Sequence, residues 1–180
     1  GVPIVLIDFE LDNHPSVVVD NQAGARSAVE HLLGLGHERI AFIGADMDHP
    51  ALQARLDGYR LAMSVSGLTA DPSMIIAAET GNPDRHTGKA LGADLLESNQ
   101  QPTAVFCVND ALALGLLDAA APKGLAVPDD LSIVGFDVVA GSRGSAPPLT
   151  TVRVFKEQLG ELALRYLGEL MGESADSGAR

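Results

Sequence analysis

The sequence predicts a doubly wound α/β fold, in which a mainly parallel sheet is flanked by helices. Three observations lead to this prediction. Short apolar runs of strand length alternate with segments of helical periodicity along the chain. Glycine or proline marks the end of several helical segments, at Gly36, Gly67 and Pro122. Apolar residues make up 46% of the 180 residues, which is enough for a packed core and excludes a disordered chain.

Each element follows from a local pattern. Ala28, Val29, Leu32 and Leu35 repeat at helical spacing before a glycine-containing stop. Asn109 and Asp110 precede an apolar helical segment, and either side chain can supply its N-cap oxygen. The expected strands are 3–8, 16–19, 40–44, 74–78, 104–108, 131–136 and 149–154, and the expected helices are 23–35, 52–66, 87–97, 111–120 and 156–172.

The bulk composition excludes several classes of partner. A formal net charge of -12 argues against binding of DNA or an anionic membrane by this chain itself. We expect no membrane contact, because no apolar run approaches the 18 or so residues that span a bilayer. Cys107 lies in an apolar run and predicts a small buried side chain in a reducing compartment. No signal peptide is visible, and the start at Gly1 in a strand-like run predicts a piece of a longer protein.

Four polar residues are candidates for ligand contact. Asp8 ends a predicted strand, and Asn109 and Asp137 each follow one. Arg55 lies early in the helix after another strand. Ligands of open parallel sheets bind at the carboxyl ends of the strands, so we expect these side chains at one rim. Carboxylate, amide and guanidinium groups there suit the hydroxyl groups of a small polar molecule.

Each candidate also has a purely structural interpretation. Asp8 starts a turn, Asn109 serves only as an N-cap, and Asp137 pairs with Arg55 or caps a loop. Arg55, taken alone, is a solvated helix residue. The sequence leaves these alternatives open.

A catalytic function is not predicted. The sequence has no nucleophile elbow, no phosphate-binding P-loop and no dinucleotide-binding glycine motif. Asp8 and Asp137 are the one conceivable acid–base pair, without a nucleophile to serve. The histidines are scattered at spacings that do not suit a metal. We therefore expect no enzyme activity, no cofactor and no metal.

The chain resembles the effector-binding part of transcription regulators of the lactose-repressor/galactose-repressor (LacI/GalR) type, whose fold is similar to that of type I periplasmic binding proteins. The resemblance covers nearly the whole chain and keeps the family order. It is carried by VPIVLID (2–8), VDNQAGA (19–25), HLLGLGHERIAFIG (31–44), RLDGYR (55–60), PTAVFCVND (102–110), VPDDLSIVGFD (127–137) and PLTTVR (148–153).

The resemblance implies a mechanism and partners. Asp8, Arg55, Asn109 and Asp137 fall on effector-contacting positions of matching motifs, and the matching acid at Asp137 faces a cleft between two lobes. The implied ligand is a small effector, a sugar or a related polar metabolite. The implied protein is a cytoplasmic, allosteric homodimer that contacts DNA only through a helix-turn-helix headpiece upstream of this chain. The alternative is a periplasmic sugar-binding protein of a transport system.

The resemblance also implies a division of the chain. We expect residues 1–21 to be a remnant of the amino-terminal lobe and residues 22–148 to form the complete effector-binding lobe. Residues 149–172 are expected to return to the first lobe as a strand and a helix, and 173–180 to form a polar tail. The family dimerises through the helix at 111–120, the loop near 138–146 and the helix near 84–90; a purely internal role for 111–120 is the alternative.

Two departures from the family pattern affect the site. Val138 stands where many members have a second acid after the Phe-Asp pair. The loop at 80–84 has no aromatic residue to stack on the effector, and Phe9 is the nearest substitute, with a core role as its alternative. These departures leave nucleosides, sugar acids and phosphorylated sugars open as effectors.

Overall fold

The computed structural model describes residues 2–78, 82–139, 141 and 144–172. It divides into two compact units: residues 1–20 with 154–180, and residues 21–153. Parts of the loops at 80–84 and 138–146, and the whole expected tail at 173–180, lie outside the described residues.

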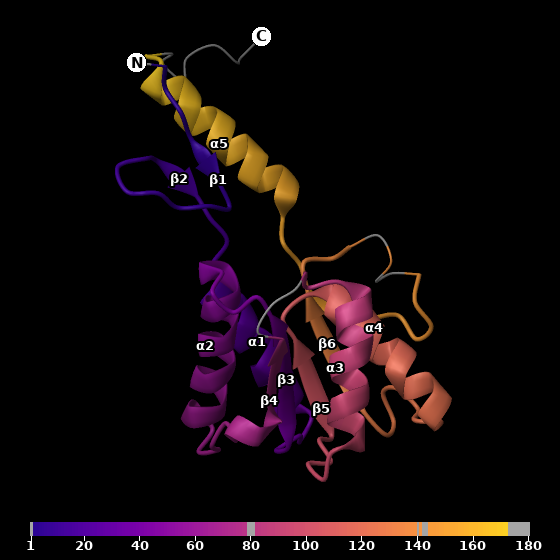
Figure 1. The fold of residues 1–180 in the computed structure, drawn as a ribbon. Helices are drawn as coiled ribbons and strands as arrows, with labels where there is room; N and C mark the ends of the chain where they lie inside the picture. Colours follow the sequence, from indigo (N-terminus) through magenta and orange to yellow (C-terminus); the bar gives the residue numbers. More distant parts are fainter. Residues whose placement is uncertain (1, 79–81, 140, 142–143, 173–180) are drawn as a thin grey trace. The chain divides into compact units, whose positions relative to one another are not determined.

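The larger unit is built on a five-stranded parallel sheet in the order β4-β3-β5-β6-β7 (Figure 1). Every residue of β3 (Ile40–Ala45), β5 (Ala104–Cys107) and β6 (Ser132–Phe136) is buried. Such nearly continuous apolar strands are typical of a parallel sheet covered on both faces. β4 (Ile75–Ala78) is one edge strand, and a 3₁₀ turn at Pro72–Met74 leads into it. The predicted fold class is confirmed.

Two helical layers cover this sheet. α1 (Asn21–Gly34) packs with α2 (Pro50–Val65) on one face, and α3 (Arg85–Glu97) packs with α4 (Asp110–Ala120) on the other (Figure 1). A glycine permits the close approach in each pair. A Cβ at Gly58 would meet the backbone oxygen of Gln22 at 2.3 Å, and one at Gly115 would meet that of Arg85 at 2.3 Å.

Aromatic side chains form the centre of the core. The Phe42 ring lies 5.6 Å from that of Tyr59 and 5.8 Å from that of Phe106, measured between centroids. The Tyr59 hydroxyl donates to the Ile40 backbone oxygen at 2.8 Å, so the buried phenol is satisfied. Burial raises the pKa of Tyr59 to about 12. Burial also raises the pKa of the Cys107 thiol, as expected for an unreactive core residue.

One strand differs from the expected arrangement. We expected residues 149–154 to return to the amino-terminal lobe, but β7 (Thr150–Val152) pairs in parallel with β6 and completes the sheet of the larger unit. The chain leaves this unit only after Arg153. Hydrophobic periodicity predicts that a segment is a strand, but it does not predict which neighbouring strand that segment pairs with.

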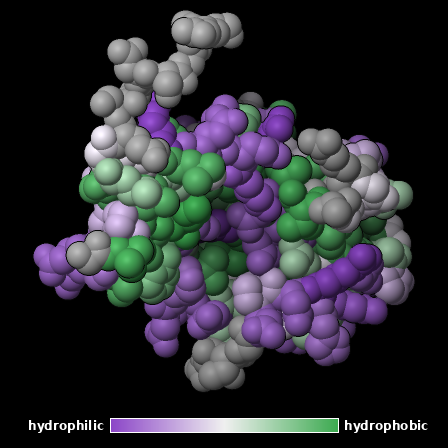
Figure 2. Space-filling view, turned by 90° about the horizontal axis from the view of Figure 1, so that it is seen from above, coloured by the Kyte–Doolittle hydropathy of each residue, from purple (hydrophilic) through white to green (hydrophobic). Residues whose placement is uncertain are grey.

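The smaller unit contains two short parallel strands, β1 (Leu6–Ile7) and β2 (Ser16–Val17), and the helix α5 (Lys156–Leu170). Ile4, Ile7 and Leu164 are 51%, 52% and 71% exposed. Figure 2 shows hydrophobic patches beside hydrophilic ones on one face of the molecule. Phe9 is 49% exposed, so a core role for it is not seen in this unit.

Candidate ligand-binding site

An ion pair joins two of the four predicted site residues. Arg55, in the second turn of α2, donates from Nη2 to Asp137 Oδ1 at 3.0 Å and from Nη1 to Oδ2 at 3.4 Å. The Arg55 side chain is only 6% exposed, whereas that of Asp137 is 28% exposed. The structure therefore explains why a buried strand ends in an acid: the carboxylate offsets a buried guanidinium while keeping part of its surface open.

Three further contacts fix the Arg55 guanidinium. Its Nε donates to Asn21 Oδ1 at 2.8 Å and its Nη1 to the Val108 backbone oxygen at 2.7 Å. Its central carbon lies 3.7 Å from the centroid of the Phe136 ring. The guanidinium thus ties the start of α1 to the ends of β5 and β6, and the interpretation of Arg55 as a solvated residue is wrong.

Asp137 has an unusual backbone conformation. Its φ is 101°, in a region that non-glycine residues rarely adopt. Its N–H donates to the Val152 backbone oxygen at 2.9 Å, which anchors the turn to β7. Arg55 occupies one acceptor position on each carboxylate oxygen, and a carboxylate oxygen accepts about two hydrogen bonds. The open part of the Asp137 carboxylate can therefore accept further hydrogen bonds, and ligand contact by Asp137 stays a prediction.

Asn109 is used in a different way. Its Oδ1 accepts from Leu112 N at 2.9 Å and its Nδ2 donates to the Pro83 backbone oxygen at 2.8 Å. It is the N-cap of α4, and it also joins that helix to the segment before α3. The structure does not show Asn109 bonded to the Arg55–Asp137 pair, and its ligand contact stays a prediction.

Asp8 belongs to the smaller unit. It follows β1 with φ 56°, and its N–H donates to the Val17 backbone oxygen at 2.8 Å. Its side chain is exposed within that unit. Ligand contact by Asp8 stays a prediction as well.

Two residues that shape the rim were not among the predicted site residues, although Asp110 was a candidate N-cap. Asn21 is a buried acceptor for Arg55. Asp110 is fully buried; it accepts from the Thr151 hydroxyl at 2.5 Å and from Val139 N at 3.0 Å. The Asn-Asp pair before α4 was the available signal, but local sequence could not tell which of the two caps the helix and which reaches β7.

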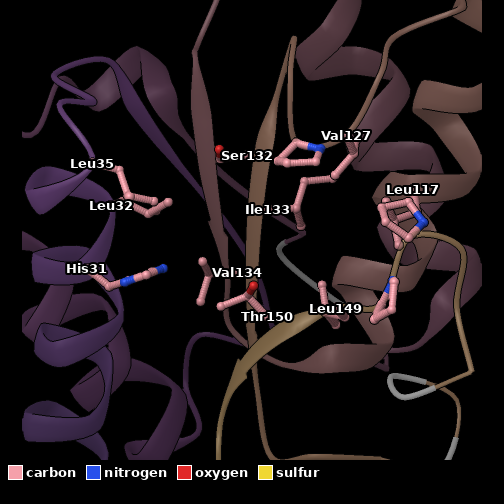
Figure 3. A pocket seen from close by; sticks show the side chains of 13 residues that line it. His31, Leu32, Leu35, Leu117, Val127, Ser132, Ile133, Val134, Leu149 and Thr150 are labelled. Carbon is pink, nitrogen blue, oxygen red and sulfur yellow. The ribbon is translucent and has the colours of Figure 1, made fainter.

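A separate cavity lies at the other end of β6 (Figure 3). Its volume is about 200 Å³, and Leu32, Ile133 and Leu149 contribute to a mainly apolar wall. His31, Ser132 and Thr150 are its few polar side chains. None of the four predicted site residues lines it. We place the candidate site at the Arg55–Asp137 rim instead, because a polar ligand requires converging hydrogen-bonding groups.

The described residues give no support for a metal site or a membrane span. No group of three or more His, Cys, Asp or Glu side chains is arranged there to hold a metal ion. No helix among the described residues has the length and apolarity to cross a membrane. Most of α4, including Leu112 and Leu116, is buried inside the larger unit, and dimerisation through this helix stays a prediction.

Comparisons with known proteins give the family. Residues 29–180 match the model of the periplasmic binding protein-like domain. The chain belongs to this family. The domain is 38% identical over 167 residues to the HTH-type transcriptional repressor CytR of Escherichia coli, covering 92% of this chain and 48% of the relative. It is 34% identical over 170 residues to the repressor PurR of Vibrio atlanticus, covering 93% of this chain and 50% of that protein.

Solved structures extend the likeness to three dimensions. A LacI-family regulatory protein from Chloroflexus aggregans superposes on this periplasmic binding protein-like domain with a TM-score of 0.87 at 31% identity, covering 97% of this chain and 63% of the other. A sugar-binding regulator of the LacI family from Escherichia coli, complexed with phosphate, gives 0.88 at 28% identity, covering 99% and 64%. The resemblance to LacI/GalR-type effector-binding domains is confirmed. The chain spans about half the length of the curated relatives it matches.

Proposed function

We propose that this periplasmic binding protein-like domain is the effector-sensing part of a LacI-type DNA-binding transcription regulator. The observation that carries the proposal is the Arg55–Asp137 pair, which is anchored at the carboxyl edge of the sheet and still partly open. The curated relatives named above are transcriptional repressors rather than enzymes, which supports regulation over catalysis and over solute transport.

The ligand of this site is a small polar molecule, a sugar or a related metabolite. Asp137 accepts hydrogen bonds from its hydroxyl or N–H groups, and Arg55 holds the carboxylate in place. Asn109 and Asp8 are the further predicted contacts. The description of one neighbour as sugar-binding supports this ligand class.

In the whole regulator, DNA contact belongs to a headpiece outside this chain, since a net charge of -12 does not suit a phosphate backbone. The regulator would work as a homodimer in the cytoplasm. The ligand would change DNA affinity by binding two conformations unequally, and the coupling equals that difference in affinity.

Thermal-shift screening of the full-length protein against sugars, sugar phosphates and nucleosides identifies the effector, because a bound ligand stabilises the folded state. Gel-shift titration with that effector then tests the site. Asp137→Ala and Arg55→Ala should abolish the effector response and leave DNA affinity largely intact. Arg26→Ala, which breaks an exposed ion pair with Glu30, is the matched control. A normal effector response in both site variants would refute the assignment.

A further inference from the structure

Arg55 reaches Asp137 in one orientation because its other donors are already engaged. Its Nε donates a hydrogen bond to Asn21 Oδ1, and its Nη1 donates one to the Val108 backbone oxygen. The Phe136 ring covers one face. These contacts leave the Nη1–Nη2 end directed at the carboxylate, as the two bonds to Asp137 show. The Asn21 oxygen is the only side-chain acceptor in this set besides Asp137 itself.

Asn21 also occupies a special position in the chain. It is the first residue of α1 and the first residue of the larger unit, so the chain passes into the smaller unit immediately before it. The second passage follows Arg153. Val152, next to that passage, accepts the backbone N–H of Asp137 at 2.9 Å. Both members of the ion pair are thus bonded to residues beside a passage between the units.

We propose that Asn21 is a positioning residue for the ligand site: its amide oxygen sets the Arg55 guanidinium, and through it Asp137, and so links the site to the chain passages. This inference rests on the proposed function, because it assigns a role to Asn21 in the same ligand site. A ligand that shifts Asp137 would act through these hydrogen bonds on Asn21 and Val152, and a change at either residue would act on the carboxylate in turn, because such coupling is reciprocal.

The hydrogen bond from Arg55 Nε to Asn21 Oδ1 is buried. Asn21 and Arg55 are 8% and 5% exposed, so water does not readily replace the amide oxygen when it is removed. A buried Nε–H without its acceptor favours rotation of the guanidinium toward another partner, and that rotation weakens both bonds to Asp137.

The experiment needs no ligand, so its outcome is separate from that of the effector screen. In the ¹⁵N-labelled protein, exchange with deuterium is followed at the Arg55 Nε–H and at the Asp137 backbone amide. Asn21→Leu preserves side-chain size and removes the acceptor. Asn21→Asp keeps an oxygen acceptor at the same place and is the rescue variant. The backbone amides of Ile43 and Phe106 report on the core.

We expect Asn21→Leu to accelerate exchange at the Arg55 and Asp137 positions by about tenfold or more, with the core amides unchanged and Asn21→Asp close to the wild type. Unchanged exchange at both positions would overturn the proposal. So would equal acceleration of the core amides, which would mean a general structural role, or an Asn21→Asp variant that behaves like Asn21→Leu. If Asn21→Leu does not fold, Asn21→Ala is read by the same criteria.

Discussion

The Arg55 guanidinium lies 3.7 Å above the ring centroid of Phe136, the residue directly before Asp137. The same arginine therefore binds the ring of one residue and the carboxylate of the next. Because neighbouring residues of a strand point to opposite faces, this is possible only where the strand has ended, and Asp137 with φ 101° makes the turn. At the end of β6, one cation thus takes part both in packing against the ring and in the ion pair of the candidate site.

The first prediction concerns stability at this position. Arg55→Ala removes the ion pair and the ring contact and leaves the Asn21 and Val108 oxygens without their donor. We expect a loss of about 2–4 kcal/mol in the free energy of unfolding, measured by urea denaturation. Arg26→Ala, which breaks an exposed pair with Glu30 in α1, should cost about 0.5 kcal/mol or less. Equal losses in the two variants would contradict a structural role for the buried arginine.

The second prediction concerns Gly135 in β6. A Cβ at this residue would lie 2.3 Å from Asp110 Oδ1 and 3.1 Å from the Leu149 side chain. Gly135→Ala should displace the buried carboxylate from Thr151 and destabilise the protein by about 2 kcal/mol or more. Gly34→Ala is the control, since a Cβ there meets nothing within 4 Å. Calorimetric melting of both variants is the measurement, and a neutral Gly135→Ala would show that Asp110 does not need its present position.

The third prediction concerns acid stability. The hydrogen bond from Arg85 holds the pKa of Asp118 below its usual value, and the Arg85 charge acts in the same direction. A carboxylate with a lowered folded-state pKa stabilises the protein above its unfolded-state pKa, and this contribution disappears as the pH falls through the folded-state value. Asp118→Asn should therefore be slightly less stable than the wild type at about pH 7 and equally stable at about pH 2. Denaturation curves at the two pH values measure the difference, and a gap that persists in acid would rule out the ion pair as its cause.

The fourth prediction concerns the buried phenol of Tyr59. Burial raises the pKa of Tyr59 to about 12. Because this folded-state pKa lies above the ordinary tyrosine value of about 10, the stability that Tyr59 contributes is lost as the pH rises from about 10 to about 12. Ultraviolet titration of the folded wild type should show a late ionisation step that the Tyr59→Phe variant lacks. Identical titration curves for the two proteins would contradict this assignment.

The sequence alone predicts most of the strands and helices, and it predicts that Arg55 and Asp137 lie close together. Continuous apolar runs such as 104–108 predict buried parallel strands, because periodicity and turn residues are local properties. The carboxyl ends of those strands predict that Arg55 and Asp137 approach each other, because all parallel strands end at one edge. The resemblance carried by the motifs predicts the family, which the comparisons show.

Only the tertiary structure decided how the polar groups are paired. Asn109 rather than Asp110 caps α4, and the Asp110 carboxylate is bound to Thr151, 41 residues further along the chain. Asn21 reaches Arg55 across 34 residues, and β7 joins β6 rather than the other lobe. Such partners are set by which segments the fold brings together. A local sequence shows that a side chain needs a partner, but the partner's identity depends on contacts between distant segments.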